Sequence, residues 1–151
     1  MIISKRSKIL LTISLLAVLP MFLLSFVVQE KEPWTSEQLM EPLALASTIS
    51  DDKSHQPVIV SVGPGAVIKG SRDIGPAGEK ANLKKLKDYL GTLKPDANIV
   101  IYCGCCPFDR CPNIRPAFTL LNTVGFRNHK LLNIRQNVKT DWIDRGYPVA
   151  E

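Results

Sequence analysis

The chain has 151 residues, of which 45 % are hydrophobic and 22 % are charged, so it is long and apolar enough for one globular domain with its own core. Its net charge of +5 arises mainly near the N-terminus, where Lys5, Arg6 and Lys8 lie, and the rest of the chain is nearly balanced. A charge this weak and dispersed argues against nucleic acid as a partner.

An uncharged apolar run from Ile9 to Val28 follows these basic residues, an order that is typical of an export signal. The run is long enough to span a bilayer and ends without a clear cleavage site of small residues, which favours a membrane anchor over a cleaved signal peptide. The basic flank is expected to stay in the cytoplasm, so the remainder should be extracytoplasmic, on the periplasmic face, either membrane-anchored or secreted. The predicted division is 1–28 for the signal peptide or N-terminal membrane anchor, 29–33 for a linker and 34–151 for the domain.

The first part of the domain carries one helix signal and one strand signal. Thr35 and Gln38 form a capping box, which predicts a helix from there through about Ser47. The β-branched residues of 58–62 predict a short strand, and the stretch 63–78 that follows is rich in glycine.

The middle of the chain shows the clearest periodicity. Leu83, Leu86, Leu90 and Leu93 recur at helical spacing with lysines between them, which predicts an amphipathic helix. Residues 99–102 have almost no polar side chains and predict a strand buried in a parallel sheet.

A further helix, a strand and a last helix complete the pattern. Asn113 is the predicted N-cap of a helix that Gly125 ends, and 131–134 is predicted as the third strand. His129, just before that strand, is expected at the surface. Thr140 can cap a short final helix. Strands that alternate with helices in this way predict an α/β domain with a mostly parallel central sheet.

All four cysteines fall in the loop between strand 99–102 and the helix that follows it. They are Cys103, Cys105, Cys106 and Cys111. In open parallel sheets, ligands bind at the carboxyl ends of the strands, which is where Cys103 is placed.

The surroundings of Cys103 predict a reactive sulfur. The N-terminus of the following helix turns its free N–H groups toward the loop, and a thiolate there has a lowered pKa. Arg110 and Arg115 are expected to lower it further. Such a thiolate is a nucleophile that needs no histidine base.

Six short segments between about Trp34 and Pro148 carry a resemblance to a known family. They read PVIVSVG, AVIKGSRDIGP, IVIYC, LLNTVGF, LLNI and DWIDRGYP. Their order and spacing resemble the core strands, the Gly-His-Ile segment, the strand before the active-site cysteine and the closing Trp…Gly-x-Pro signature of the rhodanese-like domain family. The resemblance implies a three-layer α/β/α fold with a central, mostly parallel sheet, here preceded by an N-terminal hydrophobic helix.

The same resemblance implies a sulfurtransferase that needs no cofactor. Cys103 matches the family's catalytic cysteine, which takes a sulfane sulfur from a donor such as thiosulfate and passes it on from a persulfide. The partners implied are a small anionic sulfur donor, a thiol acceptor, a reductant protein and, through the N-terminal segment, the membrane. The active-site loop would comprise Gly104, Cys105, Cys106, Arg110, Cys111, Asn113 and Arg115.

The sequence departs from the family at three places. Ser61, Val62 and Gly63 replace the family's Asp-x-Arg after the first strand, and the Gly-His-Ile segment lacks its histidine. The loop 104–112 is also longer than usual and holds three further cysteines. These departures leave the fold in place and make the chemistry of the loop the open question.

Two alternatives to sulfur transfer stay open at this point. The C-x2-C pair of Cys103 and Cys106 after a strand suggests a thiol–disulfide oxidoreductase. The cluster from Cys103 to Cys111 could instead form a thiolate site for a soft metal, Cu(I) or Zn²⁺, with all four cysteines as ligands. A structural disulfide between Cys106 and Cys111 is compatible with Cys103 as the nucleophile.

Overall fold

The computed structural model describes residues 31–51 and 55–151. The predicted signal peptide or anchor, 1–28, and the start of the linker lie outside these residues. Among the helices of the described part, none is both long and apolar enough to cross a membrane.

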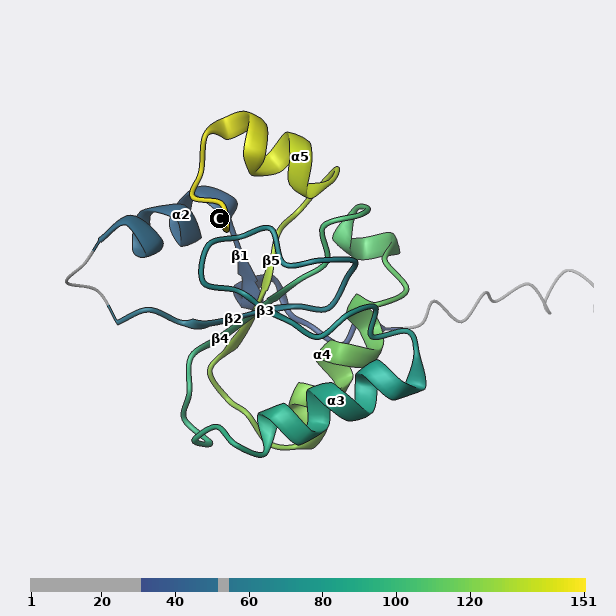
Figure 1. The fold of residues 1–151 in the computed structure, drawn as a ribbon. Helices are drawn as coiled ribbons and strands as arrows, with labels where there is room; N and C mark the ends of the chain where they lie inside the picture. Colours follow the sequence, from purple (N-terminus) through teal and green to yellow (C-terminus); the bar gives the residue numbers. More distant parts are fainter. Residues whose placement is uncertain (1–30, 52–54) are drawn as a thin grey trace, which may run out of the picture. The chain divides into compact units, whose positions relative to one another are not determined.

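A parallel sheet forms the middle of the domain (Figure 1). Its strand order is β1-β5-β4-β2-β3, and each neighbouring pair is parallel, so β4 lies at the centre between β5 and β2. The strands are β1 (Leu39–Met40), β2 (Val58–Ser61), β3 (Arg72–Asp73), β4 (Ile99–Tyr102) and β5 (His129–Leu132).

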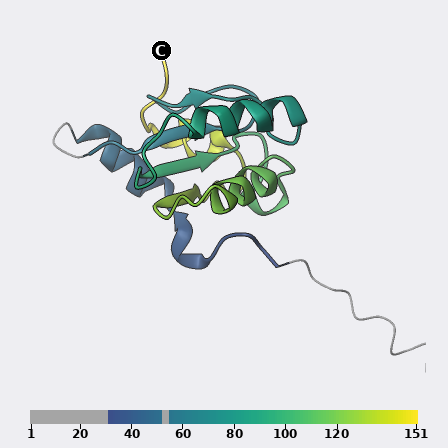
Figure 2. The same ribbon diagram turned by 90° about the horizontal axis from the view of Figure 1, so that it is seen from below.

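Helices cover both faces of this sheet, and Figure 2 shows α3 and α4 together on one of them. Figure 1 shows α2 and α5 on the opposite face. The helices are α2 (Pro42–Ser50), α3 (Lys80–Leu90), α4 (Ile114–Thr123) and α5 (Val138–Asp141), with 3-10 turns η2 (Ser36–Gln38), η3 (Phe108–Arg110) and η4 (Ile143–Arg145).

The side chains of β4 alternate between the two halves of the core, as the period of a strand requires. Ile99, Ile101 and Cys103 pack in the half that α3 and α4 cover, whereas Val100 and Tyr102 pack in the half beneath α2. This is the three-layer α/β/α arrangement with a central parallel sheet that we predicted, and it is consistent with a rhodanese-like fold.

The first predicted helix is wrong in its extent. The capping box between Thr35 and Gln38 does form, but it opens only the single turn η2. Leu39 is then extended and pairs with Leu131 of β5. The helix itself starts later, with Pro42 in its first turn, where the missing N–H has no intrahelical partner to lose.

Other predicted element boundaries differ from those of the structure by smaller amounts. Strand β5 begins at His129, two residues before the predicted start, and it buries that histidine, which we expected at the surface. The final helix is capped by the Asn137 side chain, which accepts the N–H of Thr140 at 3.0 Å. The glycine-rich stretch contributes β3, and the Tyr102 hydroxyl holds it by accepting the N–H of Val67 at 2.9 Å.

Candidate active site: a thiolate among four cysteines

Cys103 is the first residue after β4, at the carboxyl end of the central strand. Its neighbour Tyr102 still belongs to the sheet, since its carbonyl accepts the N–H of Val62 at 2.9 Å. The Cys103 side chain is 1 % exposed and points into the core half that α4 covers. The structure therefore places this cysteine at the strand end that the sequence predicts.

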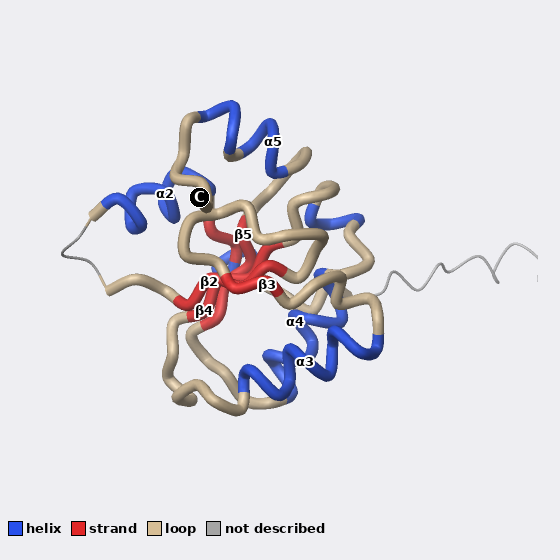
Figure 3. The backbone as a smooth tube through the Cα atoms, viewed as in Figure 1, coloured by secondary structure: helices blue, strands red, loops and turns tan. Residues whose placement is uncertain are grey.

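The long loop between β4 and α4 contains the other three cysteines and only one short 3-10 turn (Figure 3). Backbone hydrogen bonds tie it to the chain that follows β5: Phe108 donates to the carbonyl of Ile134 at 2.9 Å, and Val138 donates to that of Gly104 at 2.9 Å. The Phe108 ring also packs edge-on against Trp34. These contacts hold a loop that has few regular hydrogen bonds of its own.

The loop gathers the four sulfurs into one cluster, in which every Sγ lies within 4.8 Å of the others. The Sγ atoms of Cys103 and Cys105 are 3.3 Å apart, and those of Cys105 and Cys106 are 3.2 Å apart. Cys111 is buried, Cys106 is half-buried and Cys105 is exposed, and all four are free thiols in this structure. The sulfurs are therefore in contact without being bonded.

Hydrogen bonds within the cluster separate the acidities of its thiols. They lower the pKa of Cys103 to about 5: the Cys111 thiol contributes most, joined by the backbone N–H of Cys105 and the Asn113 amide, while burial opposes the shift. Burial and the neighbouring sulfurs raise the pKa of Cys105 to about 12. The hydrogen bond to Cys103 likewise raises the pKa of Cys111. The cluster thus favours the thiolate form at Cys103, with the Cys105 and Cys111 thiols among its hydrogen-bond partners.

Asn113 takes a different role from the one predicted. It occupies the N-cap position of α4, but its side chain makes no capping hydrogen bond. Its Nδ2 instead donates to Cys103 Sγ at 3.6 Å, and its Oδ1 accepts the N–H of Gly78 at 2.9 Å. The side chain, 8 % exposed, therefore links the glycine-rich stretch to the thiolate.

The two arginines do not account for the lowered pKa of Cys103, and this expectation is corrected. Arg115 pairs with Glu32 at 2.6 Å and lies over the Trp34 ring, while Arg110 is exposed. Hydrogen bonds to the sulfur, rather than a neighbouring positive charge, lower the pKa. A part for either arginine in binding an anionic donor stays a prediction.

Gly63 is a site residue that the sequence analysis missed. It follows β2, which is the neighbour of β4 in the sheet, and a Cβ at this position would lie 2.6 Å from Cys103 Sγ and 3.3 Å from Cys103 Cα. A side chain here would displace the sulfur. Gly63 thus approaches the Cys103 sulfur closely because β2 and β4 are neighbours in the sheet, which the sequence alone does not show.

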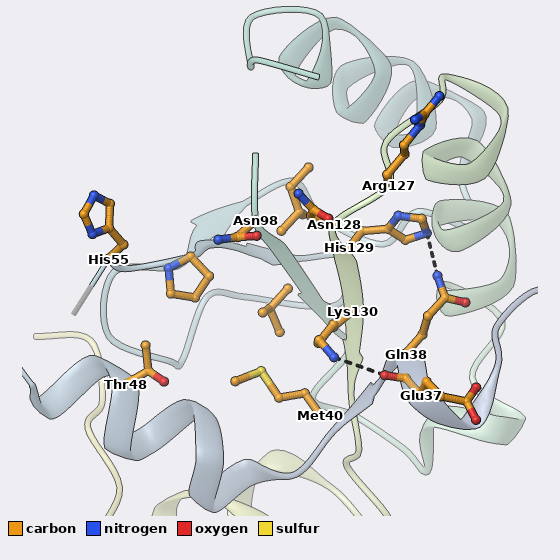
Figure 4. A pocket seen from close by; sticks show the side chains of 13 residues that line it. Glu37, Gln38, Met40, Thr48, His55, Asn98, Arg127, Asn128, His129 and Lys130 are labelled. Carbon is orange, nitrogen blue, oxygen red and sulfur yellow. Dashed lines mark hydrogen bonds between the residues drawn. The ribbon is translucent and has the colours of Figure 1, made fainter. Parts of the chain in front are cut away.

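A separate cavity of about 500 Å³ lies at the other end of the sheet (Figure 4). Its lining includes Asn98, His129 and Lys130 at the starts of β4 and β5, so it lies away from the cysteines. His129 bonds Asn122 Oδ1 at 2.9 Å, and burial lowers its pKa. Lys130 donates to the carbonyl of Glu37 at 3.1 Å. These hydrogen bonds connect β5 to α4 and to η2, so we assign both side chains a structural role.

Comparisons with known proteins bear on the fold. No family model and no curated protein matches the chain. The solved structures that match include wild-type EanB, with a TM-score of 0.56 and 15 % identity over 82 % of this chain and 29 % of EanB. Also similar is the hercynine complex of an EanB variant with valine in place of threonine, with a TM-score of 0.57 and 17 % identity over 81 % of this chain and 29 % of that one. At such identities the likeness shows a shared fold, and this chain spans less than a third of EanB.

Removal of the Asn113 amide tests the cause of the low pKa. In Asn113→Ala the thiolate loses one donor, so its pKa should rise from about 5. The rise should be about one unit, since a hydrogen bond to a charged group contributes about 1.5 kcal/mol. The thiolate exists above its pKa and is protonated below it, so its ultraviolet absorbance in the reduced, metal-free chain should appear at higher pH in the variant. Arg115→Gln is the control and should leave the midpoint in place; an unshifted Asn113→Ala would contradict this account.

Gly63→Ala should move the Cys103 sulfur, because the new Cβ would lie 2.6 Å from it. We expect the free energy of unfolding to fall by about 1–3 kcal/mol, as in other overpacked sites, and the thiolate midpoint to rise as the hydrogen bonds lengthen. Gly91→Ala is the matched control, because its Cβ would meet its nearest neighbour at 3.4 Å. Denaturant unfolding and absorbance titrations of both variants measure the free energy of unfolding and the thiolate midpoint. Equal values for the two variants would refute the close approach.

Proposed function

We propose that this chain is a sulfurtransferase in which Cys103 accepts a sulfane sulfur and carries it as a persulfide. The observation that carries the proposal is the buried Cys103 sulfur at the carboxyl end of β4, which accepts a hydrogen bond from Asn113 and whose pKa the Cys111 thiol and other donors lower. A thiolate at neutral pH is a strong nucleophile, and the ordinary thiol pKa would leave most of the group protonated. The likeness of the fold to EanB is compatible with this role.

The donor that fits the site is a small anion such as thiosulfate. The Cys103 thiolate attacks its outer sulfur, the sulfur–sulfur bond breaks, and sulfite leaves with the bonding electron pair. Asn113, at the N-cap position of the ten-residue helix α4, and the backbone N–H of Cys105 both donate to the Cys103 sulfur, so donors for an anion are present beside it. Cys103 is 1 % exposed and the exposed Cys105 lies against its sulfur, so the proposed route of the donor is from the side of Cys105.

A soft-metal site is the second candidate, favoured by the spacing of the sulfurs. In a tetrahedral thiolate site with Zn–S bonds of about 2.3 Å, neighbouring sulfurs lie about 3.8 Å apart. The four Sγ atoms, all within 4.8 Å of one another and as close as 3.2 Å, bracket that value. Cu(I) or Zn²⁺ could therefore occupy the cluster after small side-chain shifts, with Cys103, Cys105, Cys106 and Cys111 as ligands.

The oxidoreductase alternative gains less from the structure. A redox C-x2-C pair is activated by a helix that begins at the motif. Here α4 begins at Ile114, well after Cys106, and the intervening chain is loop.

The proposal includes an extracytoplasmic location, with a membrane anchor or signal at residues 1–28. The basic flank and the apolar run of the sequence support it. Protease added to intact spheroplasts should cleave the domain while a cytoplasmic marker stays whole. A domain that is cut only after lysis of the membrane would contradict this topology.

Sulfite release tests the sulfur-transfer proposal. The reduced chain, freed of reductant and given thiosulfate, should release one sulfite per chain, and Cys103→Ser should release none. Cys111→Ser is the matched control: it removes the other buried thiol, keeps a hydroxyl donor toward Cys103, and should release sulfite more slowly but to the same yield. If wild type releases no sulfite but binds one Cu(I) or Zn²⁺ that protects all four thiols from alkylation, the metal site replaces this proposal.

A further inference from the structure

We propose that Cys105 discharges the sulfur carried by Cys103 as sulfide, so that the domain reduces sulfane sulfur as well as accepting it. The inference rests on the proposed function, since it needs a persulfide on Cys103. It adds a second activity, the internal reduction of that persulfide, and assigns it to a particular thiol.

The position of Cys105 carries the inference. Its Sγ lies 3.3 Å from Cys103 Sγ, in van der Waals contact, and a disulfide needs about 2.05 Å. The gap closes with a shift of little more than an ångström in an exposed side chain. Cys106, by contrast, is placed against Cys105, at 3.2 Å between their sulfurs.

The step balances without an outside oxidant. Cys105 Sγ attacks the inner sulfur of the persulfide, Cys103 Sγ, and forms the Cys103–Cys105 disulfide. The bond between Cys103 Sγ and the outer sulfur breaks, and that sulfur takes the electron pair and the Cys105 proton and leaves as HS⁻. The sulfane sulfur is reduced by two electrons, and the two cysteine sulfurs are oxidised by the same number.

The positions of the two sulfurs decide which thiol attacks in each step of the cycle. Cys105 Sγ already touches Cys103 Sγ, so its attack on a persulfide there is intramolecular and is favoured over that of an outside thiol, which must first enter the site. Once the disulfide has formed, its accessible sulfur is that of Cys105. A dithiol reductant would attack there and expel Cys103, whose Sγ has the Asn113 amide as a hydrogen-bond donor at 3.6 Å. The implied partner is therefore a protein or small-molecule dithiol, and the products of a cycle are sulfite and sulfide.

The test follows sulfite and sulfide separately in the reduced full chain, freed of reductant and given thiosulfate. Wild type should release one of each per chain and become lighter by two hydrogen atoms, as the disulfide forms. Cys105→Ser should still release sulfite but should yield at least tenfold less sulfide, and it should become heavier by one sulfur atom. Cys106→Ser, which removes the adjacent thiol and keeps the Cys103–Cys105 contact, should release both products.

Each other outcome has one reading. Wild type that releases sulfite and keeps the extra sulfur, with no sulfide, overturns the inference and leaves the sulfurtransferase proposal standing. Sulfide at the wild-type yield from Cys105→Ser, or its loss from Cys106→Ser, overturns the assignment to Cys105. No sulfite from any variant means that the proposed function itself has failed.

Discussion

The contacts of one buried sulfur, that of Cys103, with Cys105 and Asn113 organise the loop around it. A thiolate removed from water must recover its hydrogen bonds from the protein, and here the donors come from Cys111, the Cys105 backbone and Asn113. A sulfur without these donors would stay protonated, since burial alone raises a thiol pKa. The demand for donors explains why Cys105, Cys111 and the side chain of Asn113, just before α4, converge on a single strand end.

The same arrangement supports each chemistry considered for the cluster. A persulfide needs one nucleophilic sulfur, sulfide release needs a second thiol in contact with it, and a soft metal needs four sulfurs at tetrahedral spacing. The donors to Cys103 serve the first, its 3.3 Å contact with Cys105 serves the second, and the 4.8 Å limit on all pairs serves the third. Bound metal would occupy the thiolate and block sulfur transfer, so the two functions exclude each other at any one moment.

The central part of the fold and the place of Cys103 could be predicted because their signals are local. The apolar run 99–102 forms β4 as predicted, and the leucines that repeat at the helical period form α3, although this helix ends at Leu90, before the predicted Leu93. Strands β1 and β3 are two residues long, too short for any period to show. They exist because β5 and β2 offer them hydrogen-bond partners.

The parts of the site that could not be predicted depend on contacts between distant segments. Gly63 approaches Cys103 because two strands pair in the sheet. Arg115 forms an ion pair with Glu32, which lies far from it in the sequence. The sequence shows that Asn113 precedes α4, so we predicted an N-cap. It does not show that the Asn113 amide lies beside the Cys103 sulfur, to which it donates instead. Local propensity places the backbone of such residues, and tertiary contacts decide where their side chains bond.

The most direct measurement of the central claim is the position of the first sulfur to bind. The reduced Cys105→Ser chain, treated with thiosulfate, alkylated and digested, can be sequenced by fragmentation mass spectrometry, which separates the remaining cysteines of the loop. The account predicts that the alkylated persulfide lies on Cys103, the buried sulfur at the end of β4 whose pKa is lowered. An added sulfur found on Cys106 or Cys111, with Cys103 unmodified, would contradict it.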